Sequence, residues 1–181
     1  MLTDFQKRKL PNLFKFYDAD GNGYIEAADF DAIHATFCQA AGLAKDSPQS
    51  EMLKQRLASR WVSIQKHADA NSDNRVSLDE WLAYVDKMLQ SEEQFRVEVE
   101  GIVAMIFQLF DGNRDGRLDL MEYERWHRAR RLDAKAAAAL FGAMDLNHDG
   151  SISPDECLQL VRQFFKSDNR ADPGNQLFGA V

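Results

Sequence analysis

The chain has 181 residues, of which 45% are hydrophobic and 10% aromatic, and 29 acidic side chains outnumber 22 basic ones. This length and apolar content allow a substantial core and exclude a wholly disordered chain. The net charge of −7 disfavours broad binding to nucleic acid, and no apolar run reaches the roughly 20 residues of a membrane span. Cys38 and Cys157 stand in no metal-binding or redox spacing, so we expect reduced, buried thiols and a cytoplasmic protein.

The first predicted element is a helix that includes Phe5 and Tyr17. Pro11 falls inside this helix, where it either introduces a kink or marks the true start, and we favour the kink. The helix leads into an acidic window at 18–29, with the sequence DADGNGYIEAAD. Asp, Asn and Gly are also the commonest turn residues, so one such window alone would be weak evidence for a binding site.

The same twelve-residue pattern recurs three more times, at 69–80, 111–122 and 145–156. Each window begins with Asp, has Asp or Asn at its third and fifth places, an aliphatic residue at its eighth and a carboxylate at its twelfth. Together the four windows hold 16 of the 29 acidic residues and only 3 of the 22 basic ones. Acid this concentrated repels itself unless a cation neutralises it, so the repeat indicates a cation site rather than four surface turns.

The spacing suits oxygen coordination of a hard cation. Calcium takes six to eight oxygens, which an EF-hand loop supplies from side chains at places 1, 3 and 5, a backbone carbonyl at 7, place 9 through a water, and a bidentate carboxylate at 12. The predicted ligands at places 1, 3, 5, 7 and 12 are Asp18, Asp20, Asn22, Tyr24 and Asp29; Asp69, Asn71, Asp73, Arg75 and Glu80; Asp111, Asn113, Asp115, Arg117 and Glu122; and Asp145, Asn147, Asp149, Ser151 and Glu156.

Helical periodicity surrounds the windows, which are separated by 39, 30 and 22 residues. The long first gap contains a turn-like stretch at 42–48 and then a helix from about 49 to 67. The last gap contains a strong helix former at 133–144, and Pro154 is placed to begin the final helix. We therefore predict an all-α fold of four EF-hands in two pairs, packed into a compact globule, with short β-ladders between paired loops.

The predicted organisation is an N-terminal pair at 1–90, a C-terminal pair at 91–165 and a tail at 166–181 that docks on the core. Four hands with a long first connection resemble the sarcoplasmic calcium-binding proteins, including their calerythrin-like bacterial members. The first hand is similar to that of calerythrin in ending on Asp29, and the tail from Phe164 to Gly179 is similar to the ending of calexcitin. The resemblance implies two halves packed face to face and a role in calcium buffering or signalling.

The four loops are not equivalent. The third and fourth match the pattern in full, and we expect the tightest sites there. The second has Asn74 where Gly is usual, although its ligands are suitable, so we expect weakened binding; a second loop that binds no ion is the alternative. The first closes on Asp29, one methylene shorter than Glu, which favours Mg²⁺ relative to Ca²⁺.

No catalytic motif stands out, and we expect no enzyme. The favoured function is an intracellular calcium buffer that acts as a monomer. A calcium sensor is the first alternative, disfavoured because the six Met residues are scattered and 87–103 contains no flexible linker. A luciferin-type carrier is a remote alternative in which Trp61, Trp81 and Trp126 line a cavity, although core packing explains these residues more simply. One further feature is a basic cluster that suits either a helix C-terminus or the binding of an acidic partner or phospholipid. Its members are Arg125, Arg128, Arg130, Arg131 and Lys135.

Overall fold

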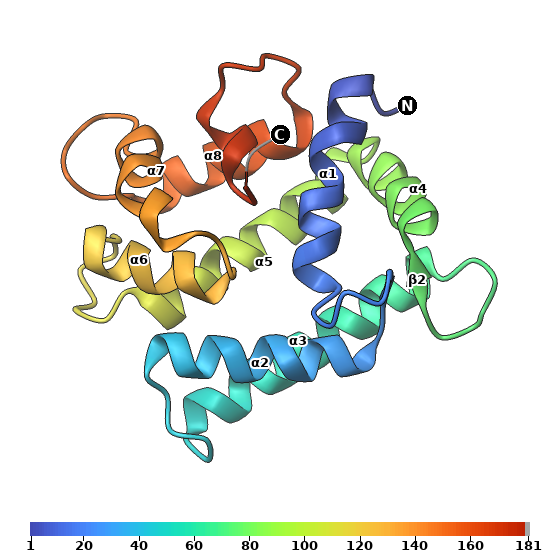
Figure 1. Ribbon diagram of the computed structural model, residues 1–181, viewed down its shortest axis with the longest axis horizontal. Coiled ribbons are helices and arrows are strands. Elements are labelled where there is room, and N and C mark those ends of the chain that lie inside the picture. Colours follow the sequence, from blue (N-terminus) through green and yellow to red (C-terminus); the bar gives the residue numbers. More distant parts are fainter. Residues whose placement is uncertain (180–181) are drawn as a thin grey trace.

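The computed structural model describes residues 1–179 and confirms the all-α prediction (Figure 1). Its α-helices are α1 (Asp4–Tyr17), α2 (Ala27–Ala41), α3 (Pro48–Ala68), α4 (Leu78–Leu89), α5 (Glu92–Phe110), α6 (Leu120–Ala129), α7 (Ala137–Met144) and α8 (Pro154–Lys166). The short elements are strands β1 (Tyr24–Ile25) and β2 (Val76–Ser77) and the 3₁₀ helices η1 (Ala134–Ala136) and η2 (Pro173–Gln176). Within the described residues, no helix is long and apolar enough to cross a membrane.

Polar caps fix where the helices begin. Helix α1 starts after a capping box of Thr3 and Gln6, so Pro11 lies in its interior and does not mark its start. Pro154 occupies the first turn of α8, as predicted, behind the N-cap Ser153. The predicted helix at 133–144 begins differently, because its first turn is the 3₁₀ helix η1, capped by Asp133.

The loops pair through their eighth places, which confirms the predicted β-ladders. Strands β1 and β2 run antiparallel, with Ile25 opposite Val76. Leu118 and Ile152 form the equivalent bridge, with N–H to carbonyl distances of 2.9 and 2.8 Å. All four aliphatic side chains are fully buried, so each bridge joins two acidic loops on the outside to the apolar core inside.

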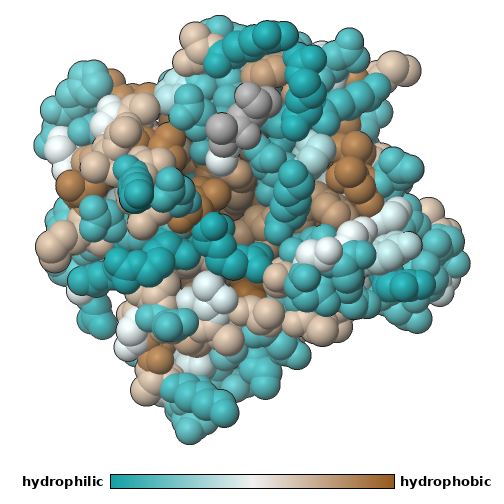
Figure 2. All heavy atoms as spheres, in the orientation of Figure 1, coloured by the Kyte–Doolittle hydropathy of each residue, from teal (hydrophilic) through white to brown (hydrophobic). Residues whose placement is uncertain are grey.

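One hydrophobic core runs through both halves of the chain. Phe37 of α2 contacts Phe110 of α5, with ring centroids 5.8 Å apart. Figure 1 shows α5 crossing the middle of the molecule between the early and late helices. On the face drawn in Figure 2, hydrophilic residues cover most of the outer surface and hydrophobic ones gather in the central hollow.

The described part of the tail lies against α8. Leu177 is buried, and the Phe178 ring packs on Phe164 with centroids 4.9 Å apart. The buried Lys9 ammonium donates to the carbonyl oxygens of Gln163 and Ser167, at 2.9 and 2.6 Å, and to Asn175 Oδ1. Burial lowers the pKa of Lys9 to about 8.

The predicted basic cluster is not one surface patch. Arg130 is buried, and Arg131 donates to the carbonyl oxygens of Phe16 and Ala19, both at 2.7 Å. These two carbonyls belong to the end of α1 and the start of the first loop, so Arg131 links the two halves. The cluster therefore serves, at least in part, to hold the fold together.

Gly174 provides a test of tail docking. A Cβ there would collide with the Leu160 carbonyl oxygen and lie 2.6 Å from Gln163 Cβ. We expect Gly174→Ala to reduce the free energy of unfolding by about 2 kcal/mol through overpacking. The matched control is Gly142→Ala in α7, where no atom lies within 4 Å of the added methyl; helix propensity predicts a gain of about 0.5–1 kcal/mol. Chemical denaturation measures both, and equal stabilities would contradict tight docking.

Candidate metal centre

Helix ends hold each acidic loop. Place 1 is the C-cap of the incoming helix in all four loops: Asp18, Asp69, Asp111 and Asp145. Place 9 is the N-cap of the outgoing helix: Glu26, Ser77, Asp119 and Ser153. Two helices that pack in the core therefore hold the two ends of each loop.

The place-1 carboxylate folds the loop around itself. Its Oδ2 accepts the backbone N–H of place 6 in every loop, at 3.0 Å from Gly23, 3.1 Å from Asn74 and 2.9 Å from both Gly116 and Gly150. Place 3 in turn accepts the N–H of place 5, as in Asn147 to Asp149 at 2.8 Å. These bonds turn the backbone N–H groups of places 5 and 6 toward the side-chain oxygens of places 1 and 3.

The place-12 carboxylate closes the loop. Glu156 accepts the N–H groups of Leu146 at 3.0 Å and Ser153 at 2.8 Å, so it ties place 2 to place 9. Asp29 makes the same two bonds, from Ala19 and Glu26, both at 2.8 Å. The shorter Asp side chain therefore closes the first loop in the same manner as Glu closes the others.

Backbone conformation explains what stands at place 6. The residues there have φ between 65° and 89°, and Asn74 adopts 65°. Asn tolerates this left-handed region better than most residues, so the second loop keeps the fold of the others without Gly. Place 4 is left-handed too, at Gly21, Ser72, Arg114 and His148, a feature that the sequence analysis did not identify.

Two observations show that the oxygens suit a cation. One carboxylate oxygen each from Asp18, Asp20 and Asp29 lies within 4.8 Å of the others. Asp111 Oδ1 is buried and has no hydrogen-bond partner among residues 1–179. Like charges gathered this closely, and a buried acceptor left unpaired, are each unfavourable unless a cation joins them. The first and third loops therefore contain oxygens that are suited to a divalent ion.

Burial and hydrogen bonds shift the pKa values of the loop carboxylates in different directions. Burial raises the pKa of Asp29. Hydrogen bonds from the Ser77 backbone and hydroxyl lower the pKa of Glu80. Burial opposes ionisation of Glu156, but the same pair of bonds from Ser153 prevails and lowers its pKa. The Ser hydroxyls at place 9 thus help to keep the closing Glu ionised and ready for a cation.

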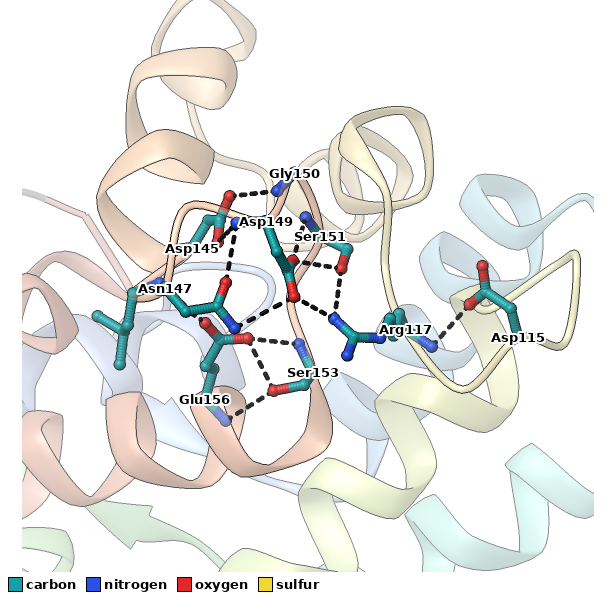
Figure 3. Close-up of polar contacts among 10 residues, drawn as sticks. Asp115, Arg117, Asp145, Asn147, Asp149, Gly150, Ser151, Ser153 and Glu156 are labelled. Carbon is teal, nitrogen blue, oxygen red and sulfur yellow. Dashed lines mark hydrogen bonds and ion pairs between the residues drawn. The ribbon is translucent and has the colours of Figure 1, made fainter.

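Side chains at place 7 join neighbouring loops (Figure 3). Arg117 of the third loop forms an ion pair with Asp149 of the fourth and donates to Ser151 Oγ at 2.9 Å. Bonds from Ser151 and then Arg117 lower the pKa of Asp149 to about 2. In the other pair, the Arg75 guanidinium lies 4.6 Å from the ring centroid of Tyr24. The ligand pattern assigns place 7 only a backbone carbonyl, whereas these side-chain contacts between loops follow from the loop pairing.

The place-9 residues were also missing from the predicted ligand set. They combine an N-cap with a closing acid three residues later, as in Ser153 and Glu156. The sequence signal was present, because Ser or Asp followed by Glu at this spacing is a capping box.

Comparison with known proteins agrees with this geometry. The EF hand family model matches residues 12–34, 102–125 and 137–161, which contain the first, third and fourth loops. Calerythrin of Saccharopolyspora erythraea is 27% identical over 91% of this chain and 94% of its own length. Sarcoplasmic calcium-binding proteins II, V, VI and VII of Branchiostoma lanceolatum are 24% identical, with 98% of both chains covered.

Solved structures share the fold. The sarcoplasmic calcium-binding protein from amphioxus superposes with a TM-score of 0.75 at 22% identity, and the match covers the whole of both chains. The coelenterazine-binding protein from Renilla muelleri, in a calcium-loaded apo form, superposes with a TM-score of 0.73 at 22% identity, over 99% of this chain and 100% of its own.

The φ of Asn74 yields a test of the second loop. We expect Asn74→Ala to destabilise the metal-free protein by about 1 kcal/mol, because Ala disfavours positive φ, whereas Asn74→Gly should be close to neutral. Gln65→Ala is the matched control, since it removes the 2.9 Å bond from Gln65 to Asn74 Oδ1 without altering the backbone requirement. Urea denaturation compares the three; an Ala variant as stable as the Gly variant would refute the role of φ.

Proposed function

We propose that this chain, which contains EF-hand loops and is similar to calerythrin and the sarcoplasmic calcium-binding proteins, binds calcium at its acidic loops and acts as a calcium buffer. The observation that carries the proposal is the cluster of carboxylate oxygens from Asp18, Asp20 and Asp29 in the first loop, supported by the unpaired Asp111 Oδ1 of the third. Four calcium ions would change the formal charge from −7 to −7 + 8 = +1. Binding would thus relieve the carboxylate repulsion and stabilise the fold.

We propose ligands at places 1, 3, 5, 7 and 12 of all four loops, as the sequence predicts, with place 9 added. The third and fourth loops should bind most tightly. The second lies outside the residues that the EF hand model matches, but the backbone hydrogen bonds that Asp69 and Glu80 accept follow the pattern of the other loops. The first is the proposed site of Mg²⁺ exchange, since its three carboxylates lie close together and Mg²⁺ is the smaller ion.

The contacts of the tail favour a buffer over a sensor. A sensor must expose an apolar groove when it binds calcium. Here Leu177 and Phe178 cover part of the interior, and Lys9 and Arg130 both hold the tail by hydrogen bonds. We propose that the protein stays closed, works as a monomer in the cytoplasm and has no catalytic role. The free, buried thiols of Cys38 and Cys157 fit a reducing compartment.

The luciferin-type carrier stays the alternative, and one observation favours it. The interior contains a cavity of about 710 Å³ to which Trp126 contributes. Trp61 and Trp81, by contrast, pack on Phe30 and Tyr17 in the core. Absorbance titration with coelenterazine tests this alternative directly.

Calorimetric titration of the metal-free protein tests the buffer. We expect three or four calcium ions to bind, with affinity reduced by millimolar Mg²⁺ and with no calcium-dependent retention on a phenyl resin. Retention that appears on calcium binding would instead identify a sensor. Calcium binding itself would be refuted if calcium addition produced no heat of binding and left the melting temperature of the protein unchanged.

Arg117 should weaken calcium binding in the C-terminal pair, because it engages Asp149 and places a positive charge beside two sites. We expect Arg117→Gln to tighten these sites by roughly three- to fivefold at low salt. The control Lys45→Gln removes an exposed positive charge from the α2–α3 connection and should change little. Unchanged calorimetric affinities in Arg117→Gln would contradict the competition.

The closing residue should set the ion preference of the first loop. We expect Asp29→Glu to raise calcium affinity relative to Mg²⁺, because the longer side chain offers both oxygens to the larger ion. Glu156→Asp, the reciprocal change in the fourth loop, should lower that ratio. Competition titrations measure both, and an unaltered Mg²⁺ effect in Asp29→Glu would count against the assignment.

A further inference from the structure

The cavity of about 710 Å³ lies between the two halves of the chain. Its walls come from α1, α2, α3, α5, α6, α8 and the tail, and apolar side chains such as Phe37, Ile106 and Val161 form most of them. Its volume falls within the range of small-molecule sites, which combine an apolar lining with a few polar groups.

The cavity is positively charged inside an acidic protein. Its lining contains three arginines and one carboxylate: Arg56, Arg60, Arg130 and Glu98. Arg60 forms an ion pair with Glu98, which neutralises both, and Arg56 is exposed. Among the described residues that line the cavity, Arg130 is therefore the charged residue that is buried and forms no ion pair with a carboxylate.

Neutral groups surround Arg130. Its guanidinium donates to the Tyr123 hydroxyl at 3.2 Å and to the Leu177 carbonyl oxygen, and it lies 4.1 Å from the centroid of the Trp126 ring. Its Nη2 also lies 3.4 Å from His127 Nδ1. Only 4% of the residue is exposed, and its Nε is buried with no hydrogen-bond partner. Burial lowers the pKa of Arg130, as expected for a charge without a counterion.

An isolated buried charge is unfavourable, and an anion of suitable shape would compensate it. An arginine in a water-poor apolar wall binds carboxylate or sulfonate oxygens strongly. An apolar entrance is available, because Met52 of α3 and Val97 of α5 both line the cavity and are 37% and 55% exposed. The cavity therefore suits an amphiphilic molecule whose anionic group lies at Arg130 and whose apolar part contacts the apolar lining.

We propose that this cavity is a binding site for a small hydrophobic molecule with one anionic group, and that Arg130 confers the preference for the anion. The apolar body of the ligand lies among the side chains of α3, α5 and α8, and its carboxylate or sulfonate faces the guanidinium. The site is separate from the calcium loops, so the proposal does not depend on calcium buffering.

Two probes that differ only in charge test this site. The first is 1-anilinonaphthalene-8-sulfonate, and the second is N-phenyl-1-naphthylamine, which has the same rings without the sulfonate. Fluorescence titration uses the full chain at saturating calcium and low salt. We expect the wild-type protein to bind the sulfonate about tenfold more tightly than the neutral probe.

Four variants locate the effect. We expect Arg130→Gln to bind the sulfonate and the neutral probe with similar affinity. Arg130→Lys should keep most of the preference for the sulfonate. Arg128→Gln removes an exposed charge from the same helix and should keep the wild-type ratio. Gly101 lines the cavity from α5, and a Cβ added there would meet no described atom within 4 Å outside the backbone of its own helix. Gly101→Phe should therefore occupy cavity space and weaken both probes by at least about tenfold.

Equal binding of the two probes by the wild-type protein, or no binding of either, would overturn the proposal. So would a preference that survives in Arg130→Gln, or probe affinities unaffected by Gly101→Phe, which would place the probes elsewhere. If Arg130→Gln does not fold, Gly101→Phe still tests whether the probes bind in this cavity. Calcium stoichiometry measured on the same samples separates a failure of this site from a failure of the calcium loops.

Discussion

The closing carboxylate at place 12 is the contact on which each loop depends. In every loop it accepts N–H groups from both the second place and the ninth, so one side chain joins the end of the incoming helix to the start of the outgoing one. Ionised oxygens are strong acceptors, and the helix N-terminus also favours a negative charge there. The residue that completes the candidate metal site is thus also the residue that shapes the loop without a metal.

Pairing of the loops converts four local motifs into one structure. Ile25 with Val76 and Leu118 with Ile152 place aliphatic side chains in the core and acidic side chains outside it. Further contacts then connect the pairs, since Arg131 reaches the end of α1 and Phe37 packs on Phe110. Cation binding in one loop is therefore mechanically connected to the packing of the helices around the interior.

The interior is the part of the molecule that the loop chemistry does not explain. Calcium buffering requires charged loops and a stable core, but it does not require a cavity or a buried Arg130. The tail covers this region, with Leu177 accepting a hydrogen bond from that arginine. A buffer with a ligand site between its halves would combine two functions on separate surfaces of the same scaffold.

The positions of the four loops, the helix predicted at about 49–67 and the helix start at Pro154 follow from the sequence alone, because they depend on contacts within about twelve residues. The spacing of Asp111, Asp115 and Glu122 fixes a loop wherever it stands in the chain, and Pro154 and Ser153 define a helix start locally. The tolerance of Asn74 for positive φ is likewise a local property.

The roles of Arg117, Arg130 and Arg131 depend on how distant parts of the chain pack together. In the sequence the last two stand side by side in one basic cluster, yet one is buried against Trp126 and the other reaches α1. Part of their surroundings comes from segments more than 40 residues away, such as Leu177 for Arg130 and Phe16 for Arg131. No local pattern encodes such neighbours, because the packing of distant helices determines which charge is buried and which stays in water.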